Sequence, residues 1–186
     1  MIRRLISGII PTLLLMGMLT LTFYIQPIEA RGTVHIRADG SVDPPIAPIS
    51  SVDNVTYTLT GNINDSIVIE RSNIIIDGNR HTVQGSGSGE GFNLTSISNV
   101  TIQNTNINGF ANGIYLYFSN NNSIYGNNIT NNQYGIYLSD SSNNSIYHNN
   151  FVNNTIQAYS DSSVNSWDDG YPSGGNYWSD YNGTDL

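Results

Sequence analysis

The chain has 186 residues and a formal net charge of −8, with 6 arginines, no lysine and no cysteine. This composition excludes a basic surface for nucleic acid, and it excludes disulfide bonds, a cysteine nucleophile and thiolate-bound metals. The chain also contains 27 asparagines, 22 serines and 24 isoleucines. Isoleucines need a buried core whereas asparagines favour turns, so the fold must accommodate both.

Residues 1–30 are predicted to be a secretory signal peptide. Arg3 and Arg4 precede an apolar stretch from Leu5 to Ile25, and Ala30 is a small residue suited to cleavage. An uncleaved membrane anchor is the alternative, because about 20 apolar residues can span a bilayer. In both cases we expect the rest of the chain to lie outside the membrane, as a secreted, extracellular or cell-surface protein or in a periplasm-like space.

Residues 31–50 are predicted to form an extended leader with little structure, since Pro44, Pro45 and Pro48 disfavour a helix. After this leader, β-branched residues alternate between clusters of Asn, Gly and Ser, and no segment has sustained helical periodicity. The sequence therefore predicts an all-β protein.

Residues 51–166 contain a 22-residue repeat, which is clearest when 123–144 is placed over 145–166. The repeat predicts a single-stranded parallel β-helix, or solenoid, of roughly four to five coils, because each coil can bury its apolar residues only against its neighbours. Strands of successive coils would pair in parallel about 4.8 Å apart. The predicted core columns are Ile102, Ile124 and Ile146; Ile107, Ile129 and Phe151; Ile114, Ile136 and Ala158; and Leu116, Leu138 and Ser160.

Asparagines recur in the same register, and we expect them at the turns, because Asn tolerates left-handed backbone geometry and stacked amides can hydrogen bond along a column. The two columns are Asn106, Asn128 and Asn150, and Asn99, Asn121, Asn143 and Asn165. Upstream, Ile76 precedes Ile102 by 26 residues, so four additional residues interrupt the repeat, and the glycine-rich run 85–91 is the predicted bulging loop. Residues 167–186 are predicted to be an aromatic, Gly-rich cap whose rings cover the open end of the core.

The coils resemble the right-handed parallel β-helix repeats of the NosD-like group, also described as carbohydrate-binding and sugar-hydrolase repeats. The segment WDDGYPSGGNYWSDY at 167–181 is similar to the one that closes many NosD-like exported archaeal proteins, and TVHIRADGSVDPP resembles their leader. The resemblance implies a right-handed β-helix in an exported protein. The family name also implies a periplasmic role in copper-enzyme maturation.

The residues themselves do not predict a metal cofactor. Copper sites use His, Cys or Met, and after residue 30 the only such residues are His35, His81 and His148. Oxygen ligands for calcium are available in the C-terminal segment, but their spacing differs from that of an EF-hand loop, so turn and capping roles are expected instead. These acidic residues are Asp168, Asp169, Asp180 and Asp185.

A sugar hydrolase would need two carboxylates about 5–10 Å apart. The densest charged group in the repeat region surrounds the irregular coil and includes Asp77, Arg80 and Glu90. As a catalytic cluster this group is the weaker interpretation, and a solvated face with loose ion pairs is the simpler one. We therefore favour a protein without catalytic activity.

Outward tyrosines are the main candidates for ligand binding: Tyr115, Tyr137 and Tyr159 form one column, and Tyr125 and Tyr147 form another. Rings repeated on every coil can stack against sugar faces, although they can also stabilise the sheet as cross-strand pairs. The sequence predicts binding of extracellular or envelope polysaccharide along this strip. The alternative is a structural cell-surface spacer, and further alternatives are copper-enzyme maturation and a polysaccharide hydrolase or lyase. The identity of the ligand and the oligomeric state are left open.

Overall fold

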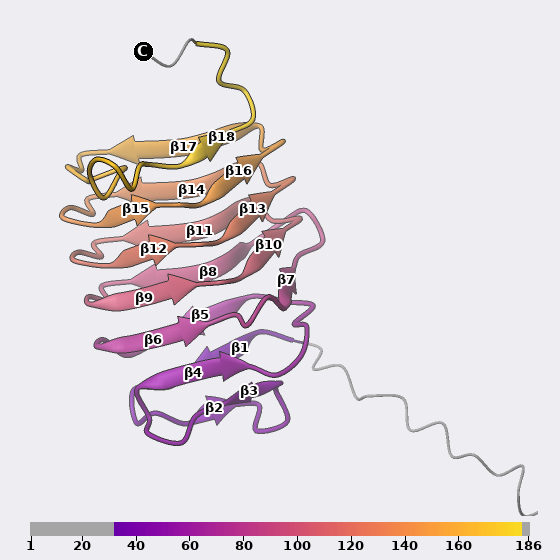
Figure 1. Ribbon diagram of the computed structural model, residues 1–186. Coiled ribbons are helices and arrows are strands. Elements are labelled where there is room, and N and C mark those ends of the chain that lie inside the picture. The colour runs from indigo at the N-terminus through magenta and orange to yellow at the C-terminus, as the bar shows by residue number, and fades with distance from the viewer. Residues whose placement is uncertain (1–31, 184–186) are drawn as a thin grey trace, which may run out of the picture.

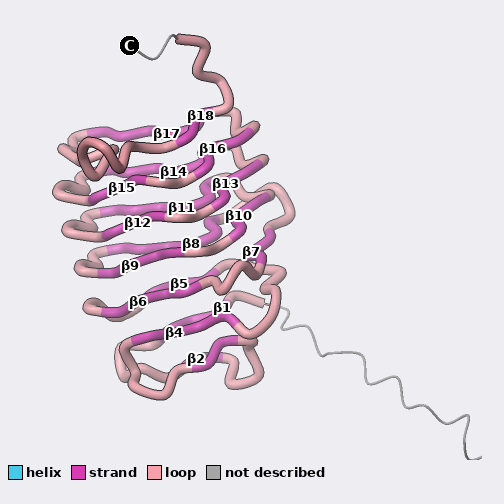
Figure 2. The backbone as a smooth tube through the Cα atoms, in the orientation of Figure 1, coloured by secondary structure: helices cyan, strands magenta, loops and turns pink. Residues whose placement is uncertain are grey.

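The computed structural model describes residues 32–183, so the predicted signal peptide and Asp185 lie outside the described residues. Within this range the chain forms about five coils stacked along one axis (Figure 1). Figure 2 shows that strands and short loops account for the whole of this part of the chain, with no helix. None of its segments is therefore a helix that could cross a membrane. The predicted all-β parallel solenoid is confirmed.

The coils build three sheets, and neighbouring strands pair in parallel except at the N-terminal end (Figure 1). The seven-stranded sheet has the order β17 (Ile156–Asp161), β14 (Tyr134–Ser139), β11 (Asn112–Tyr117), β8 (Glu90–Thr95), β5 (Ile67–Ile69), β1 (Val34–Ile36) and β2 (Val42–Asp43). The six-stranded sheet has the order β15 (Ser145–Tyr147), β12 (Ser123–Tyr125), β9 (Val100–Gln103), β6 (Ile74–Asp77), β4 (Thr56–Leu59) and β3 (Ile49–Ser50). The five-stranded sheet has the order β18 (Tyr177–Trp178), β16 (Asn150–Val152), β13 (Asn128–Thr130), β10 (Asn106–Asn108) and β7 (Thr82–Gln84).

The 22-residue register is seen directly in the strand pairs. Ile124 pairs with both Ile102 and Ile146, so one isoleucine of each coil lies above the next. Burying such a side chain contributes roughly 1.5–3 kcal/mol, and the stack repeats this gain on every coil. The other fully buried members of the predicted columns are Ile107, Ile114, Leu116, Ile129, Ile136, Leu138 and Phe151. The columns end on the last coil, where Ala158 is half-buried and Ser160 is exposed.

The four additional residues upstream are divided between two places. The offset between paired residues is 26 for Ile76 and Ile102, 24 for Val83 and Ile107, and 22 for Phe92 and Ile114. Two residues are therefore inserted in the turn 78–81 between β6 and β7, and two in the loop 85–89 between β7 and β8. The predicted glycine-rich bulge exists, but it holds only half of the insertion.

Residues 32–50 form part of the solenoid, so the expectation of a weakly structured leader is wrong. β1 pairs in parallel with β5, and both Val34 and Ile36 are fully buried. β2 and β3 then run antiparallel to β1 and β4 and close the N-terminal end of the core. The repeat did not indicate this, because Val34 pairs with Ile67, an offset of 33 residues instead of 22.

In the regular coils, a corner between sheets is made by a residue with positive φ followed by a buried residue. On the coil β12–β14 the positive-φ residues are Phe118, Asn121, Gly126 and Asn131. The buried residues that directly follow them are Ser119, Asn122, Asn127 and Asn132. The left-handed residue turns the chain and directs the next side chain into the core.

The buried asparagines form ladders of hydrogen bonds between coils. Asn127 Oδ1 accepts the N–H of Thr105 at 3.0 Å, and Asn127 Nδ2 donates to the Ile102 carbonyl at 2.9 Å. Asn149 repeats this arrangement one coil later. Its Oδ1 accepts the N–H of Asn127 at 3.0 Å, and its Nδ2 donates to the Ile124 carbonyl at 2.8 Å. The amide thus replaces the strand pairing that is interrupted at each corner, where an unpaired buried backbone group would cost about 1–3 kcal/mol. The ladders are Asn122, Asn144 and Asn165; Asn127, Asn149 and Asn176; and Asn132 and Asn154.

Apart from Asn165, the predicted asparagine columns lie beside these ladders and not within them. Asn99, Asn121 and Asn143 are positive-φ corner residues, with φ of 56°, 58° and 58°. The other column begins β10, β13 and β16, with side chains outside the core; its members are Asn106, Asn128 and Asn150. Asn165 does not continue the column of Asn143. It accepts the N–H of Asn144 at 2.9 Å, because the last coil is one residue shorter at this corner.

The C-terminal segment covers both the core and the ladders. Trp178 stacks on Phe151 with ring centroids 4.6 Å apart, and Trp167 lies 5.9 Å from Trp178. Asn176 ends its ladder by accepting the N–H of Asn149 at 3.1 Å. The two tryptophans therefore cover the core, whereas the tyrosines expected to join them are exposed: Tyr171, Tyr177 and Tyr181.

The ladders predict different effects for two adjacent asparagines. Asn149→Ala leaves a buried N–H and a buried carbonyl without a partner, so the free energy of unfolding should fall by roughly 2–4 kcal/mol. Asn150→Ala removes an exposed side chain and should change it by less than about 0.5 kcal/mol. Urea denaturation followed by circular dichroism measures both. Equal destabilisation by the two variants would contradict the ladder.

Candidate functional site

Aromatic side chains gather on the outer face of the seven-stranded sheet. We call this group the tyrosine patch; it consists of Tyr115, Tyr117, Phe118, Tyr134, Tyr137 and Tyr159. The ring centroid of Tyr137 lies 5.5 Å from that of Tyr115 and 4.7 Å from that of Tyr159. These three rings form one column over three coils. The patch stays accessible, since Phe118 is 51% and Tyr159 is 39% exposed. The patch is thus a row of stacked rings with solvent on its outer side.

Strand alternation explains why these rings point outward. In β11 and β14 the residues on either side of Tyr115 and Tyr137 are fully buried isoleucines and leucines, so the tyrosines must face away from the core. Tyr134 begins β14 and packs edge-on against Tyr137, with centroids 5.4 Å apart. Sequence reasoning missed Tyr117, Phe118 and Tyr134. The signal for Tyr117 was its position two residues after Tyr115, on the same face of one strand.

The second predicted tyrosine column lies on a different face. Tyr125 belongs to β12 and Tyr147 to β15, both in the six-stranded sheet, and their rings stack 5.2 Å apart at 9°. The Tyr125 hydroxyl hydrogen bonds to the side-chain carbonyl of Gln103. The two columns therefore form separate surfaces and not one continuous strip.

Two tyrosines of the patch, Tyr115 and Tyr137, have a raised pKa. Partial burial raises the pKa of Tyr137 above its usual value of 10.0, and the neighbouring Tyr159 raises it further. Partial burial likewise raises the pKa of Tyr115, with a smaller contribution from Tyr117. The hydroxyls of Tyr115 and Tyr137 therefore remain hydrogen-bond donors throughout the neutral and mildly alkaline range.

The charged side chains near the irregular coil do not share one site. Asp77 is on β6 of the six-stranded sheet, Glu90 is on β8 of the seven-stranded sheet, and Arg80 lies in the exposed turn between β6 and β7. Partial burial acts to raise the pKa of Asp77, but hydrogen bonds from the Asn79 N–H and the Gln103 amide outweigh it and hold the pKa below its usual value. Asp77 stays ionised and belongs to a different sheet from Glu90. It is therefore poorly suited to serve as the general acid of a carboxylate pair.

A family model described as "Periplasmic copper-binding protein (NosD)" matches residues 32–183. The chain belongs to the NosD family. No curated protein and no solved structure matches it. Membership of this family, together with the parallel solenoid, confirms the resemblance seen in the sequence. The periplasmic description is consistent with an extracellular or envelope location.

The described residues of this NosD-family chain do not fit a clustered copper site. Copper is bound mainly by His, Cys and Met, and residues 32–183 contain no Cys and no Met. Their histidines lie apart: His35 is in β1 and contacts Glu70 at 2.8 Å, His81 precedes β7, and His148 is at the corner before β16. In this part of the chain no three His, Cys, Asp or Glu side chains are arranged to hold a metal ion.

The C-terminal acids have partners within their own segment. Asp168 accepts the N–H of Gly170 at 3.1 Å, and Asp169 accepts the hydroxyl of Ser173 at 2.8 Å. Asp169 also lies 3.5 Å from His148, which links the segment to the coil beneath it. Asp180 is exposed. These contacts account for Asp168 and Asp169 as turn and bridging residues.

The tyrosine patch predicts a loss of stability at alkaline pH. Because the folded protein raises the pKa of Tyr137, the stabilising contribution of its neutral phenol is complete below the unfolded value near 10.0 and is lost as pH rises through the folded value. The free energy of unfolding should thus fall as the pH rises above about 10, and fall less in Tyr137→Phe. Urea denaturation at several pH values measures this, with Tyr171→Phe, a fully exposed position, as the control. An identical pH dependence in wild type and Tyr137→Phe would contradict the assignment.

Proposed function

We propose that this NosD-family protein is a secreted or envelope solenoid without catalytic activity that binds a neutral polysaccharide on its tyrosine patch. The observation that carries the proposal is the gathering of six aromatic rings on one outer face of the sheet, with accessible edges at Tyr117, Phe118 and Tyr159. Large exposed apolar patches on soluble proteins generally mark binding sites.

The surroundings of the patch favour a neutral, hydroxyl-rich ligand. Tyr115 pairs with Asn93, and Tyr134 pairs with Asn112, so amide groups border the rings on their N-terminal side. The charged groups that act on the rings are acidic: Glu90 acts on Tyr115, and Asp161 acts on Tyr137. Rings supply apolar faces for sugar rings, while amides and phenols bind hydroxyl groups in both hydrogen-bonding directions.

A structural spacer is the second candidate, and the ring stacking favours it. Cross-strand aromatic pairs stabilise a sheet by roughly 0.2–1 kcal/mol each, and the Tyr115–Tyr137–Tyr159 column supplies two such pairs. In this case the tyrosines would support the fold without any ligand. Loss of stability and loss of binding in the same variants must therefore be measured separately.

Truncation of a central ring provides the test of polysaccharide binding. The affinity of Tyr137→Ala should be measured from its retention in native gels containing xylan, mannan, laminarin or hydroxyethyl cellulose. We expect it to fall by about tenfold, a loss near 1.4 kcal/mol, as for a central aromatic contact. Tyr171→Ala and Tyr147→Ala remove an exposed tyrosine and one from the other sheet, and should bind like wild type. Circular dichroism checks that the fold is kept.

Two outcomes would reject the polysaccharide proposal. The first is a wild-type protein that none of the polysaccharides retards. The second is a folded Tyr137→Ala variant that is retained as strongly as wild type. If Tyr137→Ala lowers only the free energy of unfolding, the spacer function is supported instead.

The family description makes copper binding the remaining alternative, and it has its own test. We expect the protein to retain less than one copper per chain after incubation with Cu(I) or Cu(II) and extensive dialysis, measured by mass spectrometry of the metal. The physical reason is the separation of His35, His81 and His148 in the fold. One copper per chain, lost in His148→Ala, would overturn this expectation and support the copper-related role.

A further inference from the structure

A hollow lies at the corner between the five- and seven-stranded sheets, at the irregular coil. In the three later coils a buried side chain fills this corner, namely Phe110, Asn132 and Asn154. The coil β6–β8 has the exposed loop 85–89 there instead, and the coil before it has Asp65 and Ser66, which are only half-buried. With no buried side chain beneath Phe110, a cavity of about 540 Å³ remains.

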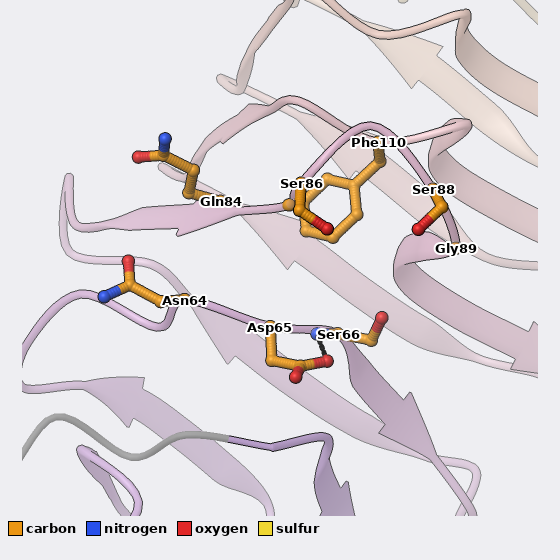
Figure 3. A pocket seen from close by; sticks show the side chains of 9 residues that line it. Asn64, Asp65, Ser66, Gln84, Ser86, Ser88, Gly89 and Phe110 are labelled. Atoms are coloured by element: carbon orange, nitrogen blue, oxygen red, sulfur yellow. Dashed lines mark hydrogen bonds between the residues drawn. The ribbon is translucent and has the colours of Figure 1, made fainter.

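Hydroxyl groups surround this cavity, and an aromatic ring forms its back wall. In Figure 3 the Ser86 and Ser88 hydroxyls point from the loop into the space, the Ser66 hydroxyl points up from the opposite side, and the Phe110 ring lies behind them. The ring can lie there because residue 85 is glycine: a Cβ at Gly85 would be 2.5 Å from Phe110 Cδ1. The cavity is thus a product of the glycine-rich loop.

The chemistry of the lining selects a small neutral ligand. Its volume falls in the range of roughly 300–1,000 Å³ that small-molecule sites occupy. The residues that line it include no Arg, Lys or His, which disfavours phosphate or carboxylate ligands. Serine hydroxyls both donate and accept hydrogen bonds, and they match the hydroxyls of a single sugar ring whose apolar side faces Phe110.

The lining of the cavity continues along the chain into β8, whose outer face leads to the tyrosine patch. Gly89 lines the cavity, and the next residue, Glu90, pairs with Asn112, which in turn pairs with Tyr134 of the patch. Two strand spacings of about 4.8 Å separate Glu90 from Tyr134, and all three side chains are on the same outer face. A short oligosaccharide can therefore reach from the cavity to the rings.

We infer that this cavity binds one sugar residue at the end of the polysaccharide whose inner residues lie on the tyrosine patch. The inference rests on the proposed function and adds that the protein recognises a chain end. A site closed beneath by the segment 64–66 and above by the loop 85–89 accepts a terminal residue, whereas the open patch accepts residues along the chain.

Saturation-transfer NMR with cellohexaose, laminarihexaose, mannohexaose and xylohexaose tests this assignment, because it distinguishes terminal from internal sugar residues. Wild type should transfer saturation to both in at least one hexasaccharide. Ser86→Trp fills the cavity, and Ser86→Ala/Ser88→Ala removes hydroxyls without adding bulk. Both should abolish transfer to the terminal residue and keep transfer to internal ones. Val52→Trp, at a fully exposed position, is the control for an added indole.

The outcomes separate the cavity from the patch. Unchanged terminal transfer in both serine variants would overturn the cavity inference and leave the patch intact. A folded Tyr137→Ala variant with unchanged internal transfer would overturn the proposed function of the patch. Absence of transfer from wild type to all four hexasaccharides would overturn both.

Discussion

The structure depends on how the backbone is satisfied at the corners of the coil. Strand pairing supplies hydrogen bonds along the three sheets, but it is interrupted wherever the chain turns from one sheet to the next. A buried Asn replaces it by accepting an N–H and donating to a carbonyl of the preceding coil, as Asn127 and Asn149 do. Among residues 32–183, every fully buried side-chain nitrogen and oxygen has a hydrogen-bond partner. The same stacked coils therefore bury the isoleucine core and satisfy the backbone at the corners through the asparagine ladders.

The ladders also explain why the repeat is strict where it is present. An amide can bridge two coils only if the same corner position recurs directly above it, so additional residues are tolerated only where they are looped out and leave the paired positions in register, as between Ile76 and Ile102. The coils β12–β14 and β15–β17 keep the 22-residue spacing and carry the asparagines. The earlier coil β9–β11 has Val100 and Phe110 at the equivalent positions, and their N–H groups are accepted by Asn122 and Asn132 of the next coil.

The sequence was sufficient for the fold and the apolar register, because Ile and Leu recur at fixed spacing and strand alternation places them inside. It was insufficient for the ladders, since asparagines occur in adjacent pairs such as Asn121–Asn122, of which only the second is buried. The left-handed corner residue breaks the alternation that the prediction relied on. Alignment with Val100, which precedes Asn122 by 22 residues, was the available signal. The first coil escaped prediction because β2 and β3 interrupt the repeat.

The candidate sites follow from the same geometry, in two opposite ways. The tyrosine patch arises where the repeat is most regular, because stacking coils in register brings outward residues of successive strands into one column of rings. The period could therefore predict the column of Tyr137, but not that Tyr125 faces another side, which depends on the corner between β12 and β14. The cavity beneath Phe110 arises where the repeat fails, because two inserted residues carry the loop 85–89 outward and leave a corner unfilled. Regular coils thus give an extended surface suited to a repeating polymer, and the corner interrupted by the loop 85–89 gives a recessed site suited to a single unit of it.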